Sequence, residues 1–220
     1  DSVHVHVSVK GYAADGDIAG LQAYVSETVE VVESEKVCSI VSEPSGTPDA
    51  FEVLFGYDIT VPVGTNIDLT NANGRVRIEE GCGAVSVETG NGGIRIAGPR
   101  GTVSAQTGNG RIKVYDAPAQ TTLTTVNGNI YAHIRDGSLV ARTTNGSILA
   151  RLLNPDVETC DLNTRNGAIT VILDGRCAAA VSLETDNGVV RADVPLDDAA
   201  TARRHVTGKV GDGGTTISAR

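Results

Sequence analysis

Apolar and polar residues alternate along most of the chain, and the dipeptide Asn-Gly interrupts the alternation at regular intervals. Successive copies are 18, 18, 18, 18, 21 and 21 residues apart, and Asp212-Gly213 follows as a degenerate copy 25 residues later. The asparagines are Asn73, Asn91, Asn109, Asn127, Asn145, Asn166 and Asn187. Period-two alternation on both sides of each copy predicts two half-buried β-strands per repeat.

Asn-Gly between two such segments is also the usual signal of a tight β-hairpin. In a meander of hairpins, however, nothing requires the same residue type at the same position of every repeat. In a β-solenoid, coils stack about 4.8 Å apart, so equivalent positions become direct neighbours in parallel ladders. Apolar residues recur in phase three residues after each asparagine, at Val76, Ile94, Ile112, Ile130, Ile148, Ile169 and Val190. The repeat therefore favours a parallel solenoid.

Two polar columns follow from this stacking. We expect the Asn side chains to hydrogen bond from coil to coil, and the next Gly to take a positive φ that turns the corner. The threonines found two residues before each asparagine from Asn91 onward should stack with their hydroxyls bonded along the row. They are Thr89, Thr107, Thr125, Thr143, Thr164 and Thr185.

The predicted fold class is all-β: a single-stranded parallel β-solenoid of about eight coils of 18–25 residues over 66–220. Residues 1–65 lack the Asn-Gly phase but include alternating strands such as SVHVHVSV, and we interpret them as an irregular β N-terminal cap. The composition agrees, because 26 Gly, two Phe and no Trp or Met leave a core of Val, Ile, Leu, Ala and Thr.

The stretch YDITVPVGTNIDLTNANGRVRI, followed by T-x-N-G-x-I repeats, resembles the opening of an adhesin family of β-strand-repeat proteins from bacteria and archaea. The likeness runs from about residue 55 to the end. It implies a β-solenoid, frequently on exported or membrane-anchored proteins, with no catalytic residues or cofactor to carry over. Asp1 as the first residue fits a mature chain after signal-peptide removal, and a trimmed chain fits equally well. We therefore expect an extracellular or cell-surface location.

The formal net charge of −9 argues against a nucleic-acid partner or an anionic membrane surface, and no apolar run is long enough for a transmembrane segment. Four cysteines without a CxxC pair argue against a thiolate metal site. In an exported protein they predict two disulfides, Cys38 with Cys82 and Cys160 with Cys177, although the connectivity is not fixed by sequence. Buried free thiols are the alternative.

The search for chemistry favours a protein that is not an enzyme. His4 and His6 share a strand face without a third metal ligand, and the corners lack the Asp of calcium-binding rolls. An outward basic stripe consists of Arg75, Arg77, Arg95, Arg111 and Lys113. Glu79, Glu80, Glu88 and Asp116 are expected to balance it. A carbohydrate- or surface-binding module using this stripe is one alternative, although the five tyrosines are scattered along the sequence and give no aromatic platform for a sugar.

The two ends suggest another function. The chain stops at GDGGTTISAR, where the last strand is expected to leave an open parallel edge, and it begins with an alternating valine strand. A head-to-tail contact between these ends need not close and would give a filament. The predicted interface residues are Val3, Val5, Val7, Val9, Val210 and Ile217. The partner is therefore a second copy in a structural homopolymer, or a cell-surface ligand of an adhesin-like monomer.

Overall fold

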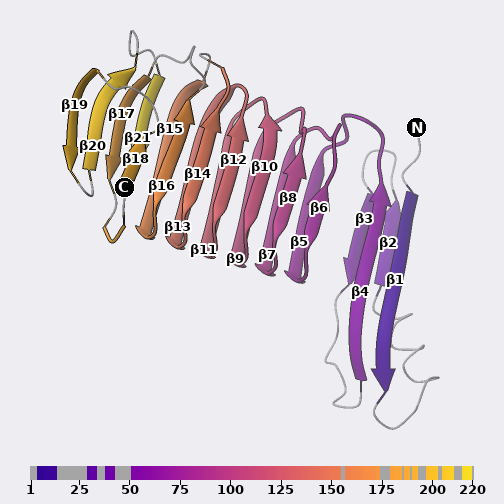
Figure 1. Cartoon of the computed structure of the whole chain (residues 1–220). Helices are drawn as coiled ribbons and strands as arrows, with labels where there is room; N and C mark the ends of the chain where they lie inside the picture. The colour runs from indigo at the N-terminus through magenta and orange to yellow at the C-terminus, as the bar shows by residue number, and fades with distance from the viewer. Residues whose placement is uncertain are drawn as a thin grey trace. The chain divides into compact units, whose positions relative to one another are not determined.

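The computed structural model of the chain describes residues 4–13, 29–33, 38–42, 51–154, 157–173, 179–184, 186–188, 190–192, 197–202, 205–210 and 215–219. The chain divides into two compact units, Asp1–Pro62 and Val63–Arg220. All elements in the described residues are strands (Figure 1). No described segment is a helix long and apolar enough to cross a membrane.

The first unit contains two antiparallel strand pairs. Strand β1 (His4–Ala13) pairs with β4 (Phe51–Thr60), and β2 (Val29–Glu33) pairs with β3 (Cys38–Ser42). These antiparallel pairs are not solenoid coils. The role of this unit as a cap stays a prediction.

The second unit is built from two sheets whose strands alternate along the chain (Figure 1). The seven-stranded sheet contains β6 (Val76–Ile78), β8 (Ile94–Ala97), β10 (Ile112–Ala117), β12 (Ile130–Ile134), β14 (Ile148–Leu152), β16 (Ile169–Leu173) and β18 (Val190–Ala192). The ten-stranded sheet contains β5 (Ile67–Asn73), β7 (Val85–Asn91), β9 (Val103–Asn109), β11 (Thr121–Asn127), β13 (Gly137–Asn145), β15 (Val157–Asn166), β17 (Ala179–Glu184), β19 (Asp197–Ala202), β20 (His205–Val210) and β21 (Thr215–Ala219).

The pairing is the one that the repeat predicts. Strands β5 to β16 form parallel ladders in which each residue lies beside its equivalent one repeat later, as Ile112 lies beside Ile94 and Ile130. Where a step is 21 residues long, the register follows the Asn-Gly phase, so Asn145 pairs with Asn166. The parallel β-solenoid is confirmed, with about six regular turns from β5/β6 to β15/β16.

The core lies between the two sheets and consists of the predicted apolar columns. Ile94, Ile112, Ile130 and Ile148 are each at most 1 % exposed on the seven-stranded side, and Leu123 and Leu162 are fully buried on the other. Because β-branched and small side chains fill the space between the two sheets, few aromatic rings are needed. Alternate residues of each strand point outward, and most of these outward side chains are polar.

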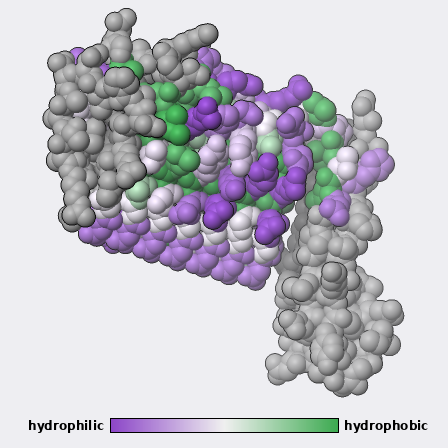
Figure 2. Space-filling model, in the orientation of Figure 1, coloured by the Kyte–Doolittle hydropathy of each residue, from purple (hydrophilic) through white to green (hydrophobic). Residues whose placement is uncertain are grey.

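The Asn column is confirmed as a continuous side-chain ladder. Each Asn Nδ2 donates to the Oδ1 of the preceding coil, at 2.8–2.9 Å from Asn91 to Asn166 and 3.2 Å at Asn187. The asparagines are exposed, and Figure 2 shows a hydrophilic band along this edge of the stack. Each amide donates to the coil below and accepts from the coil above, so the ladder fixes the register of the coils.

The Gly column is required for a different reason than the predicted positive φ. Gly74 has φ of +126°, but Gly92, Gly110 and Gly128 are not in that region. Instead, a Cβ at Gly92, Gly110, Gly128, Gly146 or Gly167 would overlap the carbonyl oxygen of the glycine one coil earlier. The corner therefore selects glycine because the backbones of successive coils touch there.

The described threonines of the Thr column are buried, and their hydroxyls do not bond along the row, contrary to the prediction. Thr107, Thr125 and Thr143 each donate to the carbonyl oxygen of the corner glycine in the preceding coil, at 3.0–3.1 Å. Thr89 is also buried, at 2 % exposure, but among the described residues its hydroxyl has no hydrogen-bond partner.

This difference predicts that a Thr→Val substitution affects the free energy of unfolding differently at Thr125 and at Thr89. Thr125→Val should cost about 1–2 kcal/mol, because the carbonyl oxygen of Gly110 loses its buried donor. Thr89→Val should be neutral or stabilising by up to about 1 kcal/mol, because it removes an unpaired buried hydroxyl. Urea unfolding of both variants at one pH measures the difference. Equal effects would show that the Thr-to-Gly bond does not contribute to stability.

The C-terminal end differs from the predicted coils. Strand β21 lies between β15 and β17 and pairs in parallel with both, while β17, β20 and β19 continue the sheet as antiparallel neighbours. The expectation of an eighth coil with an open last strand is therefore wrong. The 25-residue step contains the antiparallel strands β19 and β20, which replace a regular turn.

Candidate functional site

The outer side of the seven-stranded sheet carries the predicted basic stripe, here called the basic face: Arg75, Arg77, Arg95, Arg111 and Lys113. Strand pairing aligns Arg77, Arg95 and Lys113 in one column across β6, β8 and β10. Adjacent strands are about 4.8 Å apart, so like charges sit opposite one another, which is destabilising without counter-charges. In Figure 2 the surface over these strands is strongly hydrophilic.

The expected charge balance on the basic face is mostly absent. Arg77 forms an ion pair with Glu79, but Glu88 lies on β7 in the other sheet and Asp116 pairs with His133 at 3.1 Å. Among the described residues, Arg75, Arg95, Arg111 and Lys113 have no carboxylate within ion-pair distance. Four cations on one face thus lack a carboxylate partner in the described chain, in a protein whose net charge is −9.

Two tyrosines lie beside these cations. The rings of Tyr115 and Tyr131 are 5.3 Å apart at their centroids, and the Arg95 guanidinium lies 4.4 Å from the centroid of Tyr115. Such a cation–π contact places the positive charge over the ring face. The tyrosines are scattered along the sequence, but the fold brings this pair together. Tyr131 follows Lys113 one coil later in the same column, and Tyr115 is two residues from Lys113 on the same side of its strand, so the two tyrosines have different phases in the repeat.

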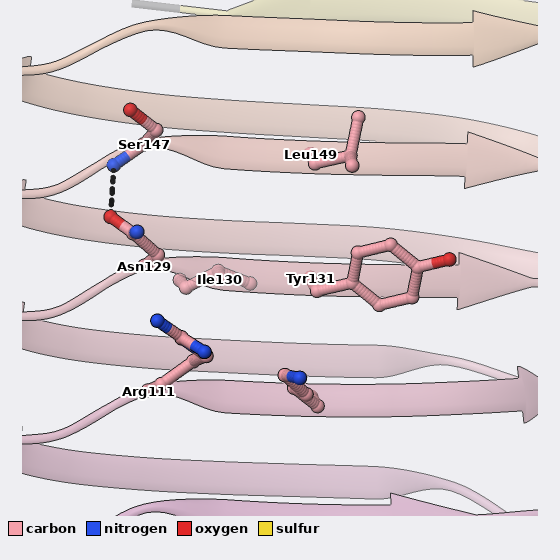
Figure 3. Close-up of a pocket in the computed structure, with 7 residues that line it drawn as sticks. Arg111, Asn129, Ile130, Tyr131, Ser147 and Leu149 are labelled. Carbon is pink, nitrogen blue, oxygen red and sulfur yellow. Dashed lines mark hydrogen bonds between the residues drawn. The ribbon is translucent and has the colours of Figure 1, made fainter.

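Beside Tyr131, a groove of about 250 Å³ crosses β10, β12 and β14. It is lined by Arg111, Lys113, Asn129, Ile130, Tyr131, Ser147 and Leu149 (Figure 3). The side-chain oxygen of Asn129 accepts a hydrogen bond from the Ser147 backbone N–H at 2.9 Å, which leaves the amide nitrogen on the groove side (Figure 3). The groove thus combines cations, a neutral donor and an aromatic ring.

A family model matches residues 13–220, almost the whole chain, and its description is Toastrack DUF4097. The chain belongs to the Toastrack DUF4097 family. No curated protein and no solved structure gives a significant match to this Toastrack chain. The family description names no activity, so the site itself must support any function.

The other predicted positions of this Toastrack chain have different outcomes. Cys82 and Cys160 are free thiols, so neither predicted disulfide forms; the side chain of Cys38 and all of Cys177 lie outside the described residues. Cys160 points into the core between Leu139 and Ile217, and burial, with the Asp161 charge, raises the pKa of its thiol far above its usual range. Burial also raises the pKa of Cys82. Both are core residues of the Toastrack fold.

The structure places five of the six predicted interface residues of the Toastrack chain in paired strands. Ile217 is fully buried within the sheet, and Val210 is half-buried on β20 opposite Ala179. Val5, Val7 and Val9 lie on β1 opposite Ile59, Tyr57 and Phe55, and Val3 lies outside the described residues. Among the described residues, no group of three His, Cys, Asp or Glu side chains is arranged to hold a metal ion. The basic face and its groove are therefore the candidate site.

Proposed function

We propose that this Toastrack chain is a non-catalytic, adhesin-like binding module that acts outside the cell, with the basic face as its contact surface for anionic polymers. The observation that carries the proposal is the column of Arg95 and Lys113 and the neighbouring Arg111, which lack carboxylate partners in the described chain. Anionic groups spaced along a polymer relieve the repulsion within this column and neutralise several cations at once. The family resemblance described above supports the extracellular location.

A structural filament is the alternative function. It relied on an open edge at the last strand, but β21 is paired on both sides. Filament growth through Ile217 therefore has no support, and surface binding accounts better for the unpaired cations.

The test is neutralisation of the face with a matched control. We expect the wild type to bind an immobilised anionic polysaccharide or anionic lipid vesicles. A triple variant with Arg95→Gln, Arg111→Gln and Lys113→Gln should have a lower affinity for the same surface. We expect a loss of roughly tenfold or more, and weaker wild-type binding in high salt. The control, Arg142→Gln, Arg165→Gln and Lys209→Gln, makes the same change in net charge on strands of the ten-stranded sheet.

The two triple variants separate site-specific binding from net charge. Arg142 and Arg165 form exposed ion pairs, which contribute little to stability, so the control should fold normally. Equal losses in both triple variants would mean that only the net charge matters. Absence of wild-type binding to every anionic surface at low salt would overturn the proposal.

A further inference from the structure

We infer that the groove over β10, β12 and β14 binds one anionic sugar unit of a linear acidic polysaccharide. The inference rests on the proposed function and names its ligand. The groove of about 250 Å³ is smaller than pockets for drug-sized ligands, roughly 300–1,000 Å³, and suits a unit the size of a monosaccharide. It lies at the end of the cationic column, so a bound unit there continues into a chain along the face.

The hydrogen-bonding groups of the groove select an acceptor-rich ligand. Arg111, Lys113 and the Asn129 amide nitrogen can donate, and no Asp or Glu lines the groove. Neutral sugars present mainly hydroxyl groups, which need acceptors as well as donors. A sugar carboxylate or sulfate presents acceptors only, and a guanidinium beside an ammonium matches it with charge-assisted hydrogen bonds.

The ring of Tyr131 distinguishes a sugar from other polyanions. Figure 3 shows this ring lying broadside over the outer face of the sheet, with Leu149 on the next strand, and Arg111 and Lys113 at the start of β10 line the same groove. Tyr115 differs, because Arg95 already lies over its ring. A pyranose ring has an apolar face of C–H groups that packs on such a surface, whereas a polypeptide carboxylate or a lipid phosphate uses only the charges. The geometry therefore favours an acidic sugar.

The strand register gives the direction of the bound polymer. Lys113, Tyr131 and Leu149 are successive members of one column, as are Arg77, Arg95 and Lys113. Cation contacts therefore repeat along the stack of coils, about 4.8 Å apart, and not along a strand. A linear chain lying across the strands places one unit on Tyr131 and its neighbours against Lys113 and Arg95.

The experiment uses three soluble probes on the full chain. They are an oligogalacturonate, the same oligomer with its carboxylates methyl-esterified, and poly-L-glutamate. The chain contains no Trp, so Tyr131→Trp introduces a single indole whose emission should change on oligogalacturonate binding. Calorimetry with Tyr131→Leu should show roughly tenfold weaker oligogalacturonate binding and unchanged poly-L-glutamate binding, while Tyr131→Phe keeps the wild-type affinity for both.

The outcomes separate this inference from the proposed function. Esterification should abolish binding, and Lys113→Gln should weaken both anionic probes. If Tyr131→Leu leaves oligogalacturonate binding unchanged, or poly-L-glutamate binds equally tightly to the wild type, the face recognises charge alone; the inference then fails and the proposed function survives. If neither anionic probe binds the wild type, the inference fails, and the proposed function fails with it when the wild type also binds no anionic surface at low salt. Thermal melting of each variant checks that an affinity loss is not unfolding.

Discussion

Gly92→Ala is expected to destabilise the second unit by about 3 kcal/mol or more, or to prevent its folding. The new Cβ would overlap the carbonyl oxygen of Gly74 in the preceding coil. Neither backbone can move away alone, because the Gly74 N–H donates to the Asn91 carbonyl at 2.8 Å and the Asn91 side chain bonds to Asn73 at 2.9 Å. The coil must therefore shift as a whole and stretch its ladders.

The adjacent glycine provides the control. A Cβ at Gly93 would lie 3.4 Å from the carbonyl oxygen of Arg111, its nearest neighbour, which is close to an ordinary contact. Gly93→Ala should therefore change the free energy of unfolding by less than about 1 kcal/mol, and reduced freedom of the unfolded chain favours stabilisation. Urea denaturation followed by far-UV circular dichroism measures both variants. Similar small effects at the two positions would show that successive coils do not touch at this corner.

These corners explain why so much of the second unit could be predicted from the sequence. In a parallel stack, residues at the same phase are neighbours, so the sequence period alone aligns Asn91 with Asn73 and Ile112 with Ile94. The atomic reason for each column was harder to predict. The threonine hydroxyls and the glycine restriction both concern one carbonyl oxygen of the preceding coil, whose position depends on the backbone of the corner.

The candidate site was only half predictable. The cations share a phase and appear as a stripe in the sequence, but their ion pairing depends on which sheet each carboxylate joins. Glu88 precedes its corner and therefore lies on the ten-stranded sheet, away from Arg95. The Tyr115–Tyr131 contact joins different phases of neighbouring coils, so counting whole repeats does not reveal it. The groove then follows from the size of the side chains at Arg111, Asn129 and Leu149.

The position of β21 could not be predicted from the repeat. The segment around Asn187 keeps the repeat phase, and its corner still stacks on Asn166 while β18 pairs with β16. On the opposite sheet, however, β21 takes the place beside β15 that this phase assigns to β17. The repeat pattern is compatible with either β17 or β21 beside β15, because Ile217 brings an apolar residue to the same column as Cys160 and Val181.

Ile217→Ala should therefore cost about 2–5 kcal/mol, because it leaves a cavity in a fully buried position between two paired strands. Thr216→Ala, an exposed change on the same strand, should stay within about 0.5 kcal/mol. A second readout is alkylation of Cys160, mapped by mass spectrometry. Its buried thiol should react slowly in the wild type and in Thr216→Ala, and faster in Ile217→Ala, where β21 is held less tightly beside it. Matching stabilities for the two variants, with Cys160 equally protected in both, would place β21 outside the core and restore the open edge that the sequence predicts.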